Sequence, residues 1–173
     1  MSNPIQNRPE GFHTVNPYLV VSGAEEVLEF LINAFDAKQV GERFKAPDGK
    51  IMHAAVRIGD SMVEIGDGPE PMPMNLHMYV DDVDGMYRRA ITSGGVSVRE
   101  PTTTFYGERS AGVKDPGGNN WWLACHVEEV SSEEILRRAK SQSDGSSPHW
   151  NNNFVRQWQD WREFQVERIL KIS

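Results

Sequence analysis

The chain has 173 residues, a length typical of one domain that buries roughly two-thirds of its unfolded surface. Its net charge of −7 and its lack of a basic stretch argue against nucleic acid or an anionic membrane as a partner. Cys125 is the sole cysteine, which excludes an intrachain disulfide and favours a reducing compartment. The first residues do not resemble a signal peptide, and no apolar run approaches the ~20 residues of a membrane span. We therefore expect a water-soluble, cytoplasmic protein.

The first half of the sequence predicts an N-terminal arm (1–15) and one folded module (16–68). A strand is expected over 16–22. An amphipathic helix is expected over 23–36, because apolar residues recur there at three- and four-residue spacing and glutamates come early. Further along, two strands flank Gly59-Asp60, a typical hairpin turn. The predicted order is β-α-β-β-β.

After a linker (69–74), the same pattern returns in a second module (75–130). A strand begins at Asn75, and the helix that follows ends at a glycine pair. Three further strands complete the unit, the last two joined by the turn sequence PGGN. The halves align with Asn16 over Asn75 and Tyr18 over His77. The sequence therefore predicts an internal duplication of one βαβββ unit.

The remaining residues, 131–173, are expected to form a C-terminal helical tail. One helix should begin at Ser131-Ser132, where two glutamates follow. A Gly/Ser/Pro linker precedes a second helix over 150–173, which carries an aromatic stripe. This stripe would pack on the domain itself, form a dimer contact or cover a pocket.

The motifs of both modules resemble the vicinal oxygen chelate superfamily, which includes glyoxalases, fosfomycin and bleomycin resistance proteins and extradiol dioxygenases. The resemblance covers residues 14–130 and rests on PDGKIMHAAVRIGD and FYGERSAGVKDPGGNNWWLACHVEEVS. The PhnB-like branch is the most similar, although YGERSA and DPGGNNWW depart slightly from its pattern. The resemblance implies an α+β fold of two tandem βαβββ modules that form curved half-barrels. It also implies a small-molecule ligand and a homodimer.

In metal-dependent members of this superfamily, ligands come from the first and last strands of each module. These positions fall on Asn16, Glu64, Asn75 and Trp122. Amide oxygens are poor ligands for Zn, Ni or Fe, and an indole has no lone pair to give. We therefore expect no metal cofactor. A divalent metal at a displaced centre, with ligands from His53, Glu64 and His77, stays open as an alternative.

The adjacent tryptophans 121 and 122 must point to opposite faces of a strand. Trp121 is expected in the core and Trp122 on the concave side, where an indole offers an apolar wall for a flat ligand. Across the cavity we expect Tyr18, His77 and Tyr79. The alternative is that Trp122 fills a closed barrel that holds no ligand.

Two charged residues carry further hypotheses. Glu64, expected beside Met62, is a candidate acid or base, or it is neutralised by Arg57 or Arg109. Arg109, near Tyr106 in the long connection of the second module, would bind an anionic group of a ligand. Alternatively, it forms an ion pair with Glu108 or Glu64.

The leading hypothesis is a metal-free protein that binds an apolar or aromatic small molecule. The alternatives are a metal-dependent lyase or dioxygenase with a rearranged metal site, and an interaction protein that acts through its tail helix. The candidate catalytic residues are Glu64 and His77. The candidate ligand-binding residues are Asn16, Tyr18, Met62, Glu64, Asn75, His77, Tyr79, Tyr106, Arg109 and Trp122.

Overall fold

A computed structural model of the protein describes residues 7–143, and the helix expected over 150–173 lies outside them. The chain divides into one unit that ends at Glu129 and another that begins at Val130. In the second unit, helix α3 (Ser132–Ser143) begins where predicted, and the Ser131 hydroxyl accepts a hydrogen bond from the Glu134 amide. Among residues 7–143, no helix combines the length and apolarity needed to cross a bilayer.

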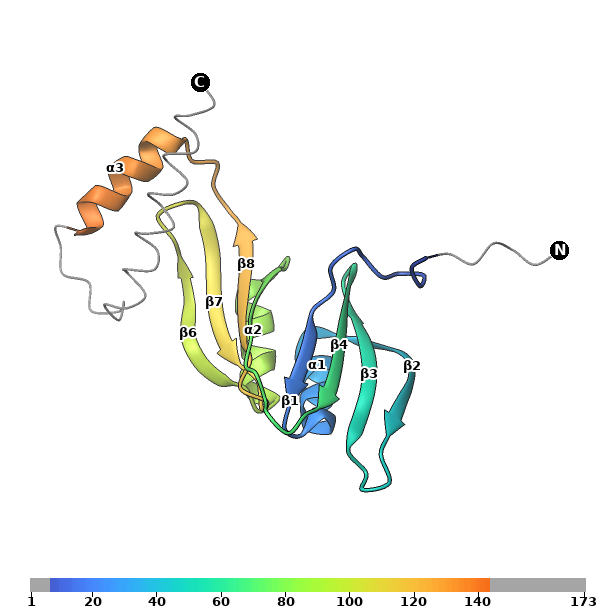
Figure 1. Ribbon diagram of the computed structural model, residues 1–173. Helices are drawn as coiled ribbons and strands as arrows, with labels where there is room; N and C mark the ends of the chain where they lie inside the picture. Colours follow the sequence, from blue (N-terminus) through green and yellow to red (C-terminus); the bar gives the residue numbers. More distant parts are fainter. Residues whose placement is uncertain (1–6, 144–173) are drawn as a thin grey trace. The chain divides into compact units, whose positions relative to one another are not determined.

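The first module forms a four-stranded sheet covered by one helix (Figure 1). The strand order is β1-β4-β3-β2, with β1 parallel to β4 and the other pairs antiparallel. The predicted Gly59-Asp60 turn joins β3 to β4, with Gly59 at φ 57°. The elements are β1 (Tyr18–Val21), α1 (Ala24–Phe35), β2 (Lys38–Lys45), β3 (Ile51–Ile58) and β4 (Ser61–Asp67).

The second module repeats this arrangement, with strand order β5-β8-β7-β6 and β5 parallel to β8. The α+β fold of two tandem βαβββ units that the sequence predicts is therefore confirmed. The elements are β5 (Asn75–Tyr79), α2 (Val83–Thr92), β6 (Val96–Thr103), β7 (Glu108–Lys114) and β8 (Asn120–His126).

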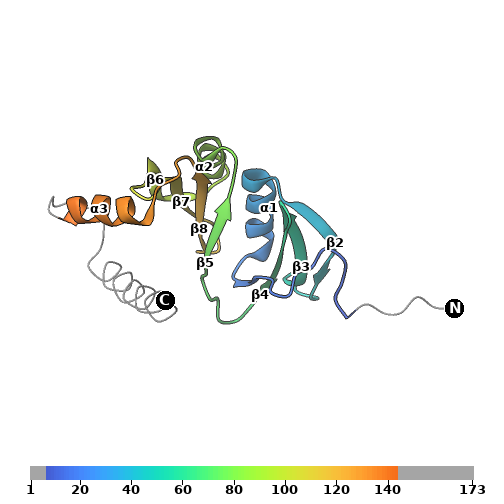
Figure 2. The same ribbon diagram turned by 90° about the horizontal axis from the view of Figure 1, so that it is seen from above.

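One hydrophobic core joins the two modules. Helices α1 and α2 pack against each other, and Figure 2 shows them side by side. The ring of Phe35, the last residue of α1, lies 5.1 Å from the Trp121 ring of β8, as expected for a core Trp121. Arg89 and Asp36 form an ion pair of 2.8 Å across the same junction. The helix-covered faces of both sheets therefore meet in this core, and we call the opposite face of each sheet its outer face.

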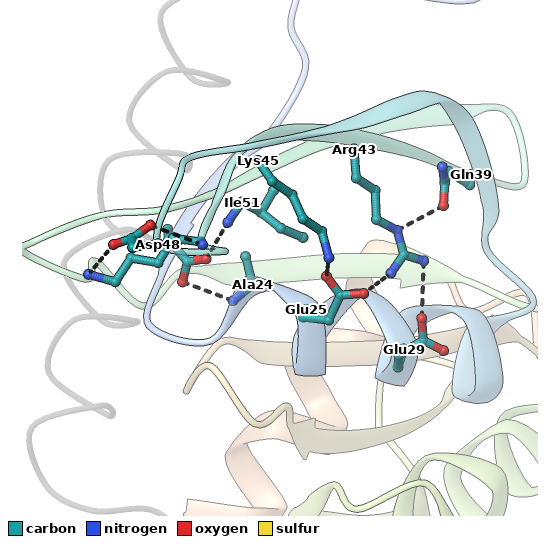
Figure 3. Close-up of polar contacts among 10 residues, drawn as sticks. Ala24, Glu25, Glu29, Gln39, Arg43, Lys45, Asp48 and Ile51 are labelled. Carbon is teal, nitrogen blue, oxygen red and sulfur yellow. Dashed lines mark hydrogen bonds and ion pairs between the residues drawn. The ribbon is translucent and has the colours of Figure 1, made fainter.

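Polar contacts tie the edge strand β2 to helix α1 (Figure 3). The Arg43 guanidinium pairs with Glu25, and also with Glu29 at 3.0 Å. Lys45 reaches Glu25 at 2.9 Å, and Gln39 accepts a hydrogen bond from Arg43 at 2.9 Å. Only 18% of the Arg43 side chain is exposed, so its pairs are less screened than ordinary surface ion pairs.

Helix α1 takes its N-terminal cap from a distant strand. It starts after Gly23, which supplies no side chain, and the Asp67 carboxylate at the end of β4 accepts the Gly23 and Ala24 amides at 2.8 and 3.1 Å. The same carboxylate accepts the Ile51 amide at 2.9 Å. Burial raises the pKa of Asp67, but the three amide hydrogen bonds and the positive charge of Lys50 together lower it by more, so the pKa is below its ordinary value.

The turn between β7 and β8 is built around a buried carboxylate. Asp115, 3% exposed, accepts hydrogen bonds from the Asn119 amide at 2.9 Å and from the Trp121 indole at 2.9 Å. Asn119 is fully buried, and its side-chain oxygen accepts the Met74 amide at 3.0 Å. The turn therefore fixes both the Trp121 side chain and the start of the second module.

Gly117 brings this turn into contact with the first module. A Cβ at this position would lie 2.8 Å from Val27 of α1 and 2.9 Å from Val21 of β1. Only a glycine permits so close an approach. A turn of the second module thus closes part of the core of the first.

Candidate functional site

The outer face of the first sheet carries an acid–imidazole pair between two aromatic rings. His53 Nε2 lies 3.0 Å from Glu64 Oε1. Glu64 pairs with Ala55 in the ladder, so His53, two residues away, shares its face. The Tyr18 and Phe44 rings lie 6.1 and 6.4 Å from the imidazole, on either side of it in the strand order. Each of the four strands contributes one member of this row.

The accessibility of this row decides what it can contact. Tyr18 and Phe44 are 41% and 60% exposed, and Glu64 is half-buried. Met62, expected beside Glu64 in a pocket, is only 2% exposed. A Cβ on Gly11 would lie 4.0 Å from the Met62 sulfur, so the N-terminal arm passes close to Met62. A ligand on this face would therefore meet the aromatic rings and the carboxylate first.

The outer face of the second sheet carries a corresponding row. The ladders align His77 with Trp122, Trp122 with Gly112, and Gly112 with Arg99. A Cβ on Gly112 would lie 2.8 Å from the Trp122 ring, so the indole crosses β7 directly over the glycine. The Arg99 guanidinium carbon lies 5.1 Å from the centre of that ring. Trp122 therefore faces away from the core, as predicted.

Beyond this row, the second face continues with a tyrosine and a carboxylate. The His77 and Tyr79 rings meet edge to face at 5.0 Å. The Tyr79 hydroxyl donates to Glu108 Oε1 at 2.9 Å. This hydrogen bond, together with the negative charge of Glu108, raises the pKa of Tyr79 above its ordinary value of 10.0.

The positions that the resemblance assigns to metal ligands do not form a suitable donor set. The Asn16 side chain exchanges two hydrogen bonds with the His13 backbone, at 2.9 and 2.8 Å. Asn75 accepts a hydrogen bond from the Asn120 amide at 3.1 Å. Trp122 has no lone pair, which leaves Glu64 as the single strong ligand. Within residues 7–143, no three His, Cys, Asp or Glu side chains are grouped to hold a metal ion.

Arg109 lies on the opposite side of the second sheet from Trp122. Its guanidinium binds both carboxylate oxygens of Asp84 on α2, at 2.9 and 2.7 Å. This hydrogen-bonded pair lowers the pKa of Asp84 and raises that of Arg109. The ion pair expected with Glu108 or Glu64 is therefore replaced by one with Asp84. Arg109 does not share a face with the other candidate residues.

Glu64 also has a partner other than the expected one. Arg57 donates to the Gly59 carbonyl at 2.9 Å, and the partner of Glu64 is His53. Tyr106 lies in the connection between β6 and β7, where its ring meets that of Phe105 at 5.1 Å.

Six of the candidate residues therefore fall into two groups, one on each sheet, whereas Asn16, Tyr106 and Arg109 belong to neither group. Tyr18 and Glu64 lie on the outer face of the first sheet. The second sheet carries the larger group on its outer face: Asn75, His77, Tyr79 and Trp122.

Sequence reasoning missed Phe44, Arg99 and Gly112. A register irregularity between Ser97 and Arg99 in β6 breaks the alternation from which faces are assigned. For Gly112 a signal did exist, because a glycine opposite a tryptophan in a predicted hairpin indicates a ring that crosses the strand.

Comparison with known sequences identifies a family. Residues 11–123 match the family model of the Glyoxalase/Bleomycin resistance protein/Dioxygenase superfamily. An uncharacterized protein of Mycobacterium bovis is 35% identical over 145 residues, which cover 76% of this chain and 95% of that protein. An uncharacterized protein of Mycobacterium tuberculosis is also 35% identical, with 85% of its length covered.

Solved structures share the fold at low sequence identity. TioX from Micromonospora sp. ML1 matches with a TM-score of 0.55 and 19% identity, over 65% of this chain and 99% of that one. The fosfomycin resistance protein FosX from Mesorhizobium loti matches with a TM-score of 0.51 and 21% identity, over 72% and 97% of the two chains. With the family model matched over more than half of its length, the chain belongs to the glyoxalase/bleomycin resistance protein/dioxygenase superfamily.

Proposed function

We propose that the protein binds an apolar or aromatic small molecule without the help of a metal ion. This proposal depends on the side chains at the four positions where metal-dependent members of the family have their ligands. Glu64 alone supplies a carboxylate, and it is hydrogen-bonded to His53. Aromatic rings occupy the remaining outer surface, with Tyr18 and Tyr79 exposed and Trp122 half-buried. Such surfaces stack on flat ligands.

The binding site is completed in a homodimer. The shared core holds the helix-covered faces together, so the two outer faces of one chain lie on the far sides of their sheets. A second copy would cover an outer face and exclude water from its rings, as the exposed Phe44 and Tyr79 favour. A cytoplasmic location and membership of the PhnB-like branch complete the proposal.

The test is metal analysis combined with binding of a neutral aromatic probe. Purified full-length protein should contain no stoichiometric Ni, Zn or Fe, and it should bind Nile red equally well with and without EDTA. Trp122→Ala should weaken binding about tenfold, which is a loss of roughly 1.4 kcal/mol. Val98→Ala, at another exposed apolar residue of the second sheet, should bind as the wild type does.

Size-exclusion chromatography with light scattering tests the dimer in the same samples. If the dimer dissociates in the same variants in which the affinity for the probe falls, this would support a binding site that is shared between two copies of the chain. One equivalent of bound metal, with binding lost on chelation, would overturn the proposal.

The His53–Glu64 pair favours a second candidate, an enzyme of the lyase or dioxygenase class. A carboxylate that orients an imidazole can assist proton transfer, or the pair can supply two ligands of a rearranged metal centre. The test substrates are a methylglyoxal–glutathione hemithioacetal and a catechol. Turnover that is lost on chelation, restored by one metal and abolished in His53→Ala would favour this enzyme over the metal-free binding protein.

A further inference from the structure

We propose that the ligand is a planar aromatic cation, which binds beside the Glu64 carboxylate on the outer face of the first sheet. This inference rests on the proposed binding function and names its ligand class. The four strands of that sheet place a carboxylate and an imidazole between two exposed aromatic rings. The face of an aromatic ring and a carboxylate both attract organic cations.

The first step in the argument is the position of the Tyr18 ring. A Cβ on Gly66 of β4 would lie 2.9 Å from the Tyr18 hydroxyl oxygen, so the glycine lets the ring cross that strand. The hydroxyl then donates a long hydrogen bond of 3.4 Å to the Met52 carbonyl on β3. Glu64 is the direct neighbour of Tyr18 in the ladder between β1 and β4. The ring therefore lies next to the carboxylate, and a flat ligand can stack on its exposed side.

The second step is the state of the Glu64 carboxylate. Among residues 7–143, one of its oxygens has a partner: Oε1 lies 3.0 Å from the His53 imidazole nitrogen. Because an ionised carboxylate can only accept hydrogen bonds, the imidazole donates, and a neutral imidazole is sufficient for this. The bond orients the carboxylate, and it leaves Oε2 to contact a ligand. Glu64 is half-buried, so solvent screens its charge less than that of an open surface carboxylate.

The third step is the distribution of positive charge on the second outer face. The Arg99 guanidinium carbon lies 5.1 Å from the centre of the Trp122 ring, so this indole already has a cationic partner. Lys114 lies on the same face, two residues beyond Gly112 in β7. Like charges repel, so a cationic ligand is disfavoured there.

The positive side chains of the first outer face lie farther from the carboxylate. Glu64 pairs with Ala55 in the ladder, and Arg57 comes two residues later. The Arg57 guanidinium donates to the Gly59 carbonyl at 2.9 Å, which holds it toward the β3–β4 turn. Lys38 pairs with Arg57 and belongs to the same more distant row. The aromatic rings on both sides of the acid–imidazole pair are therefore the better surface for a cation.

The experiment compares 1-methylquinolinium with 4-methylquinoline, a molecule of the same shape that is neutral at about pH 8. We expect the full-length wild type to bind 1-methylquinolinium about tenfold more tightly by isothermal titration calorimetry, with a preference that shrinks at high salt. Glu64→Gln should remove the preference while 4-methylquinoline still binds, because glutamine keeps the size of the side chain without its charge. Glu108→Gln, the matched change at a carboxylate of the second outer face, should keep the preference.

Two further variants test the rings. Phe44→Leu should reduce the preference about threefold, since leucine keeps an apolar side chain without a ring face for the cation. Tyr18→Leu should weaken both compounds about fivefold, because it removes the surface on which they stack. Both side chains are exposed, and circular dichroism checks that each variant is folded. Unchanged binding in both variants would overturn the placement of the ligand on this sheet.

The possible outcomes separate this inference from the function on which it rests. Equal binding of both compounds to the wild type, or a preference that survives Glu64→Gln, would overturn the inference and leave the binding function intact. Failure of the wild type to bind 1-methylquinolinium, 4-methylquinoline and Nile red would overturn both.

Discussion

The β3–β4 turn of the first module and the β7–β8 turn of the second occupy equivalent places in one repeated unit, yet they are built differently. The first is the two-residue Gly59-Asp60 turn, exposed to solvent. The second is longer and contains the buried Asp115 and Asn119. The first turn reverses the chain and contacts the N-terminal arm through His13 and the Asp60 carbonyl, 2.9 Å apart, whereas the second fixes a core tryptophan and docks on the other module. Equivalent positions in a duplicated fold thus carry unequal shares of its stability.

The outer faces differ in a similar way. The first presents a carboxylate and an imidazole between aromatic rings, and the second presents an indole beside a guanidinium. The buried core that the two sheets share is apolar. The repeat therefore keeps its packing and varies its chemistry on the surfaces that a ligand can reach.

The largest expected effect comes from removal of the buried turn carboxylate. Asp115→Ala leaves the Asn119 amide and the Trp121 indole without their acceptor, and it should lower the free energy of unfolding by about 3 kcal/mol. Asp60→Ala in the exposed turn should change it by less than about 0.5 kcal/mol. Urea unfolding of both variants measures the difference. Equal losses would show that the two turns contribute alike.

The two helix caps provide the next contrast. Asp67→Ala removes a carboxylate that three amides share, and it should cost about 2 kcal/mol. Asp82→Ala removes the cap of α2, which accepts only the Gly85 amide, and it should cost about 1 kcal/mol. Thermal and urea unfolding at neutral pH test this order. A larger loss in Asp82→Ala would contradict it.

Acid should remove the contribution of Asp67. Its folded pKa lies below 3.8, the ordinary value expected in the unfolded chain. The stabilisation is therefore complete well above that value and declines as the pH falls through the folded pKa. The stability difference between wild type and Asp67→Ala should accordingly shrink in acid. A difference that is independent of pH would show that the charge of the carboxylate is unimportant.

A smaller effect is expected at the ion pairs between helix and sheet. Arg43→Gln breaks contacts with Glu25 and Glu29 and should cost about 1 kcal/mol, because its side chain is only 18% exposed. Arg109→Gln breaks the more exposed pair with Asp84 and should cost less. It should also leave the affinity for Nile red within about twofold of the wild type. A large loss of affinity would show that Arg109 takes part in ligand binding.

The smallest change concerns one ionisation on the second outer face. Glu108→Gln removes the carboxylate that raises the pKa of Tyr79, so this pKa should fall toward 10.0. Alkaline titration of the tyrosinate absorbance, with Tyr79→Phe to identify the signal, measures the shift. An unchanged titration would mean that the hydrogen bond does not persist in solution.

The order of the elements followed from the sequence because it depends on local patterns. Helical spacing, turn glycines and strand alternation each span a few residues, and alternation alone separated Trp121 from Trp122. Asn16 was assigned to a strand, although its short side chain bonds locally to His13 and β1 starts at Tyr18. The strand boundary therefore moved by two residues and took a candidate ligand out of the sheet.

The partners of charged residues depend on contacts far apart in the chain, and these could not be read from local patterns. Asp67 caps a helix that starts more than forty residues earlier, and Arg109 finds Asp84 across the sheet–helix interface. Arg99 was missed because an irregular register shifts its face. The division of the candidate site between two outer faces follows from the shared core, which is a property of the assembled modules.

The contact of Gly117 with Val21 and Val27 has a consequence for how this duplicated protein can be divided. If the chain were cleaved at the linker between the modules, the fragment with the first module would lose the turn that covers part of its core. The fragment with the second module would keep a β7–β8 turn that no longer packs against Val21 and Val27. Neither fragment should fold as an independent domain. The two modules should therefore fold only as one unit.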